Sequence, residues 1–159
     1  MNVIEGDAKT AEELLDKKWN YIFFTGSVKI GRIVAMTAAK NLTPFTLELG
    51  GKSPAIVDEE TDIMVTCKRI VWGKLLNSGQ TCVAPDYLIV HKSIKDLLVT
   101  EIIKTIEKLY GSTKKKSDDL TSIVNKNNFN RLKKIIEINK VLYGGKFDEK
   151  NLYISPTII

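Results

Sequence analysis

Apolar and polar residues follow one another along the chain in a pattern that predicts alternating strands and helices. The apolar run at residues 21–24 stops at Thr25-Gly26 and predicts a buried strand. From residue 28 to residue 40 the apolar positions recur on one face, which predicts a helix with Ser27 as its N-cap. Residues 45–49 then alternate with the period of a second strand. We therefore expect the chain to open with a strand, a glycine turn, a helix and another strand.

The same alternation continues along the rest of the chain. Thr10, followed three positions later by Glu13, predicts the start of a helix over residues 10–18. Further strands are expected at residues 54–58, 86–91 and 152–159, and further helices at residues 62–77, 94–109 and 126–138. Strands separated by helices are typical of the α/β class, as in doubly wound sheets. The hydrophobic pattern thus predicts an α/β fold.

A candidate active site lies where the helix predicted over residues 62–77 gives way to an extended segment. Asn77-Ser-Gly-Gln-Thr-Cys82 places a thiol after a glycine turn, and Val83-Ala84-Pro85 closes that turn. Catalytic nucleophiles favour such junctions, because a turn exposes the sulfur while packed elements hold it in place. A lone cysteine is otherwise most simply a small buried hydrophobe, and Cys67, on the apolar face of the predicted helix, fits that description. Cys82 is therefore the candidate nucleophile.

Three motifs in this order closely resemble the aldehyde dehydrogenase superfamily. They are Phe24-Thr25-Gly26-Ser27, Leu47-Glu48-Leu49-Gly50-Gly51-Lys52-Ser53-Pro54 and Asn77-Ser-Gly-Gln-Thr-Cys82. The continuation Val83-Ala84-Pro85-Asp86-Tyr87 is similar to the class 3 branch of that family, which includes the fatty aldehyde enzymes. Any one motif would be a weak signal, but three in sequence are specific. The resemblance runs through essentially the whole chain and covers a middle portion of the family's longer polypeptide.

The resemblance implies a mechanism and a set of site residues. The family's pattern places the nucleophile on Cys82 and the general base on Glu48. It implies oxidation of an aldehyde to a carboxylic acid through a thiohemiacetal and a thioester, with NAD or NADP accepting the hydride. Cofactor-binding roles are implied for Gly26, Ser27, Gly31, Leu49 and Gly50. The residues alone leave a solvated Glu48 and an ordinary turn at Gly26 open, since this turn lacks the usual G-x-G-x-x-G fingerprint.

The resemblance also implies a partial aldehyde dehydrogenase fold, with the end of a Rossmann-like coenzyme domain followed by the start of an α/β catalytic domain. We place residues 1–49 in the partial NAD(P)-binding domain and residues 50–159 in the partial, cysteine-bearing catalytic domain. An oxyanion-stabilising asparagine, a lysine and a later glutamate that hold the cofactor's riboses, and a strand used in homodimer formation belong to other segments of full-length relatives. The 159-residue chain alone is therefore expected not to turn over aldehyde.

Composition and charge narrow the classes of protein. A chain of 159 residues with 43% hydrophobic and 27% charged residues is typical of a globular domain. The sequence shows no apolar run of about 18 residues and no signal-peptide pattern, so we expect a cytoplasmic protein without a membrane segment in this chain. A membrane anchor in a full-length form stays open. One histidine and two cysteines are too few ligands for a zinc site, and no metal is expected.

The net charge of +5 is concentrated after residue 60, and such asymmetry can mark a surface that binds nucleic acid. The densest basic run, Lys114-Lys115-Lys116, has no aromatic residue interleaved and predicts a solvated loop. We therefore expect a small-molecule aldehyde as the partner, and no nucleic acid.

Two other functions compete with the enzyme hypothesis. The chain could be a truncated, catalytically inactive product that retains the site residues and acts, if at all, as a binding or interaction module. It could also be an independent cysteine redox protein, but such a site needs a resolving thiol nearby. Cys67 lies 15 residues from Cys82 on a predicted core face, which disfavours the redox hypothesis.

Overall fold

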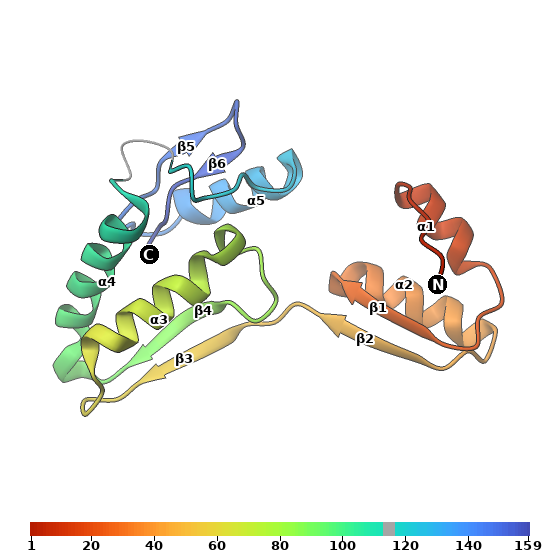
Figure 1. Ribbon diagram of the computed structural model, residues 1–159, viewed down its shortest axis with the longest axis horizontal. Coiled ribbons are helices and arrows are strands. Elements are labelled where there is room, and N and C mark those ends of the chain that lie inside the picture. The colour runs from red at the N-terminus through yellow and green to blue at the C-terminus, as the bar shows by residue number, and fades with distance from the viewer. Residues whose placement is uncertain (113–116) are drawn as a thin grey trace. The chain divides into compact units, whose positions relative to one another are not determined.

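The computed structural model describes residues 1–112 and 117–159, which form two compact units, Met1–Gly51 and Lys52–Ile159. Each unit has its own helices and strands and is described by itself (Figure 1). The basic run Lys114-Lys115-Lys116, predicted as a solvated loop, lies outside the described residues. That the units correspond to a coenzyme domain and a catalytic domain stays a prediction.

The first unit is a strand, helix, strand arrangement preceded by one short helix. Its elements are α1 (Ala8–Leu15), β1 (Ile22–Gly26), α2 (Val28–Lys40) and β2 (Phe45–Leu49). The two strands pair in parallel, in register from Ile22 opposite Phe45 to Gly26 opposite Leu49. Helix α2 packs against both strands and buries Val34 and Ala38 (Figure 1). Because the pairing is parallel, both strands end at the same edge.

Local capping explains where the helices of this unit begin. The predicted cap of α2 is confirmed, because the Ser27 Oγ accepts a hydrogen bond from the N–H of Ile30 at 3.3 Å. The predicted start of α1 at Thr10 is wrong. Asp7 is the N-cap, and its Oδ1 accepts hydrogen bonds from the N–H groups of Lys9 at 3.0 Å and Thr10 at 3.3 Å. The Asp7 carboxylate, three positions before Thr10, thus accepts from the free amides of the first turn, and the helix begins earlier than predicted.

The second unit is built around helix α3 (Ile63–Leu75). Strands β3 (Ser53–Val57) and β4 (Pro85–Val90) flank this helix in the chain and pair in parallel. Helix α3 packs against β4 and against helix α4 (Lys95–Tyr110) (Figure 1). The buried cluster that joins these elements comprises Val57, Cys67, Val71, Leu98, Ile102 and Ile106. The predicted place of Cys67 on a core face is confirmed.

Apart from helix α5, the remaining elements of this unit are short. They are the 3-10 turns η1 (Leu76–Gly79) and η2 (Lys92–Ile94), helix α5 (Lys126–Glu137) and the antiparallel strands β5 (Phe147–Asp148) and β6 (Tyr153–Ile154). Helix α5 is anchored by the buried Phe129, whose ring meets that of Phe147 edge-on with centroids 6.2 Å apart. Residues 152–159, predicted to be extended, form only this two-residue strand and a bridge between Tyr143 and Ile158. Within the described ranges, no helix is long and apolar enough to cross a membrane.

The core of the second unit can be tested with two neighbouring leucines of α4. Leu98 is 0% exposed and Leu97 is 52% exposed. We expect Leu98→Ala to lower the free energy of unfolding by about 2–5 kcal/mol, because the truncation leaves a cavity in the core. Leu97→Ala carries the same change in helix propensity without a cavity and should cost less than about 1 kcal/mol. Urea unfolding followed by circular dichroism measures both values, and equal losses would contradict this packing.

Candidate functional site

Cys82 lies in a tight turn between α3 and β4. The N–H of Ala84 donates a hydrogen bond to the carbonyl of Thr81 at 3.1 Å, so Cys82 and Val83 occupy the two central positions of the turn. Ala84 is buried, whereas Cys82 is exposed. The turn is therefore anchored on one side and presents its thiol on the other, as a nucleophile requires.

The backbone that leads into this turn is left-handed at three successive residues. The φ angles are 52° at Asn77, 55° at Ser78 and 80° at Gly79. Left-handed geometry costs roughly 1–2 kcal/mol at a residue that carries a Cβ, so Asn77 and Ser78 are strained. Gly79 avoids this cost, and a Cβ there would also lie 3.2 Å from the carbonyl oxygen of Lys74. Helix α3, predicted to run to Asn77, ends at Leu75, because Leu76 is already extended with ψ 127° and the left-handed residues follow it.

We call residues 77–84 the cysteine loop, and its side chains bind residues 121–124, the 121–124 segment. The Ser78 Oγ donates a hydrogen bond to the carbonyl of Thr121 at 2.7 Å. The Gln80 Nε2 donates to the carbonyl of Ser122 at 3.1 Å, and the Gln80 Oε1 accepts from the N–H of Val124 at 2.9 Å. These three bonds join parts of the chain that are far apart in sequence. They fix the backbone next to Cys82.

A cluster of charges lies beside the cysteine loop. The Lys52 Nζ and the Asp86 carboxylate form an ion pair at 2.8 Å, and the Lys74 Nζ approaches the other oxygen of Asp86 at 3.9 Å. Burial lowers the pKa of Lys74, Asp86 opposes that shift and Lys52 adds to it. The loop therefore begins next to a partly buried ammonium group.

The second thiol, Cys67, has a different environment. It is fully buried in α3, and its Sγ lies 3.9 Å from the carbonyl oxygen of Leu98. Burial raises the pKa of the Cys67 thiol, and the nearby Glu101 carboxylate raises it further. Since the thiolate is the reactive form, Cys67 is suited to packing rather than to chemistry.

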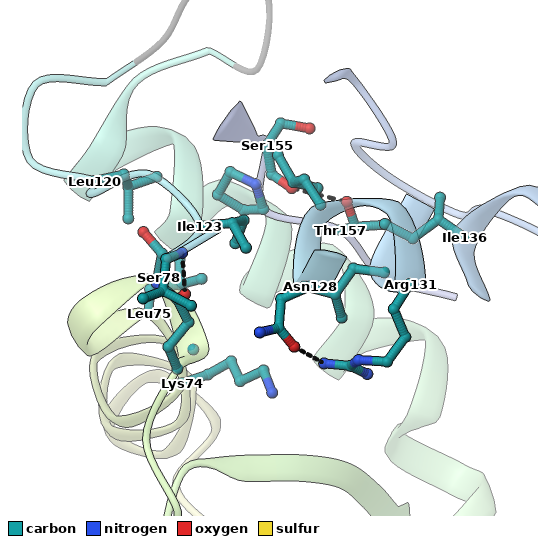
Figure 2. A pocket seen from close by; sticks show the side chains of 16 residues that line it. Lys74, Leu75, Ser78, Leu120, Ile123, Asn128, Arg131, Ile136, Ser155 and Thr157 are labelled. Carbon is teal, nitrogen blue, oxygen red and sulfur yellow. Dashed lines mark hydrogen bonds between the residues drawn. The ribbon is translucent and has the colours of Figure 1, made fainter. Parts of the chain in front are cut away.

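A cavity of about 410 Å³ lies between the cysteine loop and α5. Its apolar lining consists of Leu75, Leu120, Ile123, Val124, Leu132, Ile136, Ile154 and Pro156. Figure 2 shows Lys74 and Arg131 extending toward the same open region, and the guanidinium of Arg131 donates to the Asn128 Oδ1 at 3.4 Å. Two cations above apolar walls can accept an anionic molecule with an apolar part. Sequence reasoning missed Lys74 and Arg131, because each falls on the polar side of an ordinary amphipathic helix.

In the first unit, Glu48 is exposed on β2, opposite Thr25 of β1. A Cβ built on Gly31 of α2 would lie 2.8 Å from Leu49 and 3.6 Å from Leu47, so these two leucines face the helix. Side chains alternate along a strand, and Glu48 therefore projects from the opposite face of the sheet. The carboxylate is open to solvent, as a base that activates water requires.

The predicted cofactor residues fall into two groups. Gly26 ends β1 and is followed by Ser27, and Leu49 ends β2 at the same edge and is followed by Gly50. No described atom lies within 4 Å of a Cβ built on Gly50, so another molecule can approach this backbone closely. Gly31 instead lies buried where α2 meets β2. That contact gives it a packing role, while its predicted role in cofactor binding stays untested.

Cys82 and Glu48 belong to different units, so their cooperation in one site stays a prediction.

His91, to which the sequence assigns no role, caps η2, and its Nδ1 lies 2.7 Å from the Ser93 Oγ and 3.3 Å from the Glu59 carboxylate. The part of the chain that the structure describes contains no group of three or more His, Cys, Asp or Glu side chains that could hold a metal ion.

Known proteins match the chain along its whole length. The model of the aldehyde dehydrogenase family matches residues 1–159. The chain is 46% identical over 157 residues to "Aldehyde dehydrogenase, dimeric NADP-preferring" of Rattus norvegicus, with 99% of this chain and 35% of that protein covered. It is 50% identical over 155 residues to "Aldehyde dehydrogenase family 3 comG" of Dictyostelium discoideum, with 98% and 33% covered. The chain thus spans about a third of the length of the curated relatives it matches.

The chain is also similar to solved structures of aldehyde dehydrogenases. The substrate-bound Staphylococcus aureus AldH matches with a TM-score of 0.89 and 45% identity, over 97% of this chain and 34% of that one. The Mycobacterium tuberculosis aldehyde dehydrogenase complexed with NAD+ matches with a TM-score of 0.83 and 28% identity, over 96% and 34%. These matches confirm the predicted partial α/β fold.

The two thiols should differ in reactivity. With a limiting amount of iodoacetamide near neutral pH, we expect Cys82 to be alkylated at least about ten times faster than Cys67, because Cys67 is buried and its pKa is raised. Peptide mass mapping measures the two rates. In denaturant the rates should converge, which is the control. Faster labelling of Cys67 in the native chain would contradict the assignment.

Proposed function

Because the chain belongs to the aldehyde dehydrogenase family, we propose that it carries the nucleophile and the general base of an enzyme that oxidises an aldehyde to a carboxylic acid. The predicted likeness to the class 3 branch is confirmed, since the curated relatives include family 3 members. The observation that carries the proposal is the exposed Cys82 in a turn closed by the hydrogen bond from the N–H of Ala84 to the carbonyl of Thr81. Since the chain spans about a third of its relatives, the activity of a whole protein is part of the proposal.

Cys82 acts first. Its thiolate attacks the carbonyl carbon of the aldehyde, a carbon–sulfur bond forms, and the carbonyl oxygen takes up the negative charge. The backbone N–H of Cys82 is the donor we propose for this oxygen. Thiolate suits the step because it is intrinsically nucleophilic and later leaves readily from the acyl group. The products of this stage are a thiohemiacetal and, after loss of a hydride, a thioester.

Glu48 acts last. Its carboxylate takes a proton from water, the resulting hydroxide attacks the thioester carbon, and the carbon–sulfur bond breaks to release the acid and the Cys82 thiolate. An exposed carboxylate on the open face of β2 is accessible to water, which supports this role. Residues 1–49 would then belong to a coenzyme domain and residues 50–159 to a catalytic domain.

The edge where β1 and β2 end fits NAD or NADP. Parallel strands bind nucleotides beyond their carboxyl ends, and Gly26, Ser27, Leu49 and Gly50 lie there. The capped N-terminus of α2 favours a negatively charged group, and the open backbone at Gly50 leaves room for a ring. When bound, the dinucleotide supplies the hydride acceptor. The rat relative is named dimeric and NADP-preferring, and we propose a homodimer and a nicotinamide cofactor for the whole protein.

A hybrid enzyme tests the proposal. Residues 1–159 would replace the matched third of the Staphylococcus aureus AldH, and aldehyde-dependent formation of NADH or NADPH would be followed at about 340 nm. We expect the hybrid to be active and Cys82→Ala to abolish that activity, because the nucleophile is lost. The 159-residue chain alone should show no turnover, since loss of one oxyanion donor typically costs roughly 10²–10³ in rate.

Each outcome of this assay has a definite meaning. A folded hybrid without activity would favour the alternative of an inactive product that acts as a binding module. Robust activity of the chain alone, abolished by Cys82→Ala, would show that the segments outside the matched stretch are dispensable. Cys67→Ala is the matched control and should leave a folded hybrid active.

The role of Glu48 has its own kinetic signature. In the hybrid, Glu48→Gln should preserve the first burst of NADH and slow the steady state by at least about a hundredfold, because only hydrolysis of the thioester needs the base. Stopped-flow absorbance separates the two phases. Glu60→Gln, an exposed glutamate of the second unit, is the control and should change neither phase. Equal loss of burst and steady state would place the base elsewhere.

A further inference from the structure

We propose that Gln80 is a positioning residue, which holds the cysteine loop in its reactive conformation by bonding it to the 121–124 segment. The inference rests on the proposed role of Cys82 as nucleophile. Gln80 lies two positions before that thiol. In this proposal its side chain acts on the backbone of the loop and not on the reacting atoms. Its function would be to keep the turn that carries Cys82 in the position seen in the structure.

The amide of Gln80 uses both of its polar ends. The Nε2 donates to the carbonyl of Asn77 at 3.1 Å, within the loop, and to the carbonyl of Ser122 at 3.1 Å, across to the 121–124 segment. The Oε1 accepts from the N–H of Val124 at 2.9 Å. One side chain thus satisfies three backbone groups on two parts of the chain. A primary amide suits this task, because it donates and accepts at once.

The loop needs such a restraint because of its backbone. Asn77 and Ser78 are both left-handed, a conformation that residues with a Cβ leave readily unless the surroundings hold them. Their relaxation to right-handed geometry would redirect the backbone after Leu76 and move the turn that carries Cys82. The Gln80 amide binds the carbonyl of Asn77, the first of the strained residues. It therefore acts directly on the strained part of the loop.

The other end of the restraint is firmly held. Ile123 of the 121–124 segment is buried, with 5% of its surface exposed, and its N–H donates to the carbonyl of Leu152 at 2.8 Å. The Ser78 Oγ adds a parallel bond to Thr121. Gln80 consequently couples the cysteine loop to a packed part of the second unit.

Replacement by glutamate gives a test with an internal rescue. An ionised carboxylate cannot donate, so Gln80→Glu should place negative oxygens against the carbonyls of Asn77 and Ser122. A protonated carboxyl group can again donate one hydrogen bond and accept another. The carbonyls of Asn77 and Ser122 favour the protonated carboxyl, whereas Lys74 and Arg131, which line the same cavity, favour the ionised one. We therefore expect acylation of Cys82 in the variant to be impaired near pH 8 and to recover relative to the unchanged chain as the pH falls toward about 5, where the carboxyl takes up a proton.

The readout is acylation of the 159-residue chain by 4-nitrophenyl acetate, seen as a burst of released 4-nitrophenol, whose neutral and ionised forms are both counted because the neutral form dominates at the lower pH. In this reaction the thiolate attacks the ester carbon and nitrophenolate leaves, so no cofactor is required. We expect the burst rate of Gln80→Glu to be about tenfold below that of the unchanged chain near pH 8 and within about twofold near pH 5. Ser78→Ala removes the bond to Thr121 but keeps the Gln80 amide, so near pH 8 its burst rate should lie between those of Gln80→Glu and the unchanged chain.

Controls separate this inference from the proposed function. Asn130→Asp adds the same charge at an exposed position of α5 and should not change the burst. Amide hydrogen exchange at Val124, followed by NMR, should accelerate in Gln80→Glu near neutral pH, which reports the lost bond without any chemistry at the thiol. A burst that survives Cys82→Ala would refute the nucleophile assignment. A burst that requires Cys82 but is equal in Gln80→Glu and the unchanged chain at every pH would overturn the positioning role.

Discussion

The site depends on one backbone constraint, the left-handed stretch from Asn77 to Gly79 that follows the end of α3. A helix that continued would carry Cys82 along its own axis, whereas three left-handed residues turn the chain at once toward β4. Gly79 makes the change sterically feasible beside the carbonyl of Lys74, and the bonds to the 121–124 segment keep it in place. The conformation of the cysteine loop therefore depends both on its left-handed backbone and on the hydrogen bonds that hold this backbone against the 121–124 segment.

The two cysteines show how one helix serves two purposes. Cys67 lies on the face of α3 that packs with Leu98, and burial there raises its pKa. Cys82 lies seven positions after the last residue of the same helix and is exposed. The residue type is identical, but the position relative to the core decides whether the sulfur acts as a packing atom or as a candidate nucleophile.

In the first unit, the parallel pairing of β1 and β2 decides which residues lie together at one edge of the sheet. Because β1 and β2 run in the same direction, Gly26 and Leu49 are register partners, and the turn that caps α2 lies beside the end of β2. Residues separated by more than twenty positions thus form one edge with an open backbone and a helix N-terminus. Gly31 contributes differently, since α2 approaches β2 so closely there that a Cβ would require the end of the Leu49 side chain to shift.

The sequence by itself determined the helices and the identity of the candidate nucleophile, because those signals are local. Apolar spacing predicted α2 and its cap at Ser27, and the motif around Cys82 marked the loop. Other features were settled only in the tertiary structure. The Gln80 bond to Val124 spans 44 positions and the Ser78 bond to Thr121 spans 43, and no pattern within either segment encodes the other. In the sequence, Arg131 has the pattern of an ordinary surface residue, and only the packing of α5 beside the cysteine loop makes it part of the cavity wall. Hydrogen bonds and cavity walls of this kind depend on which distant segments meet in space.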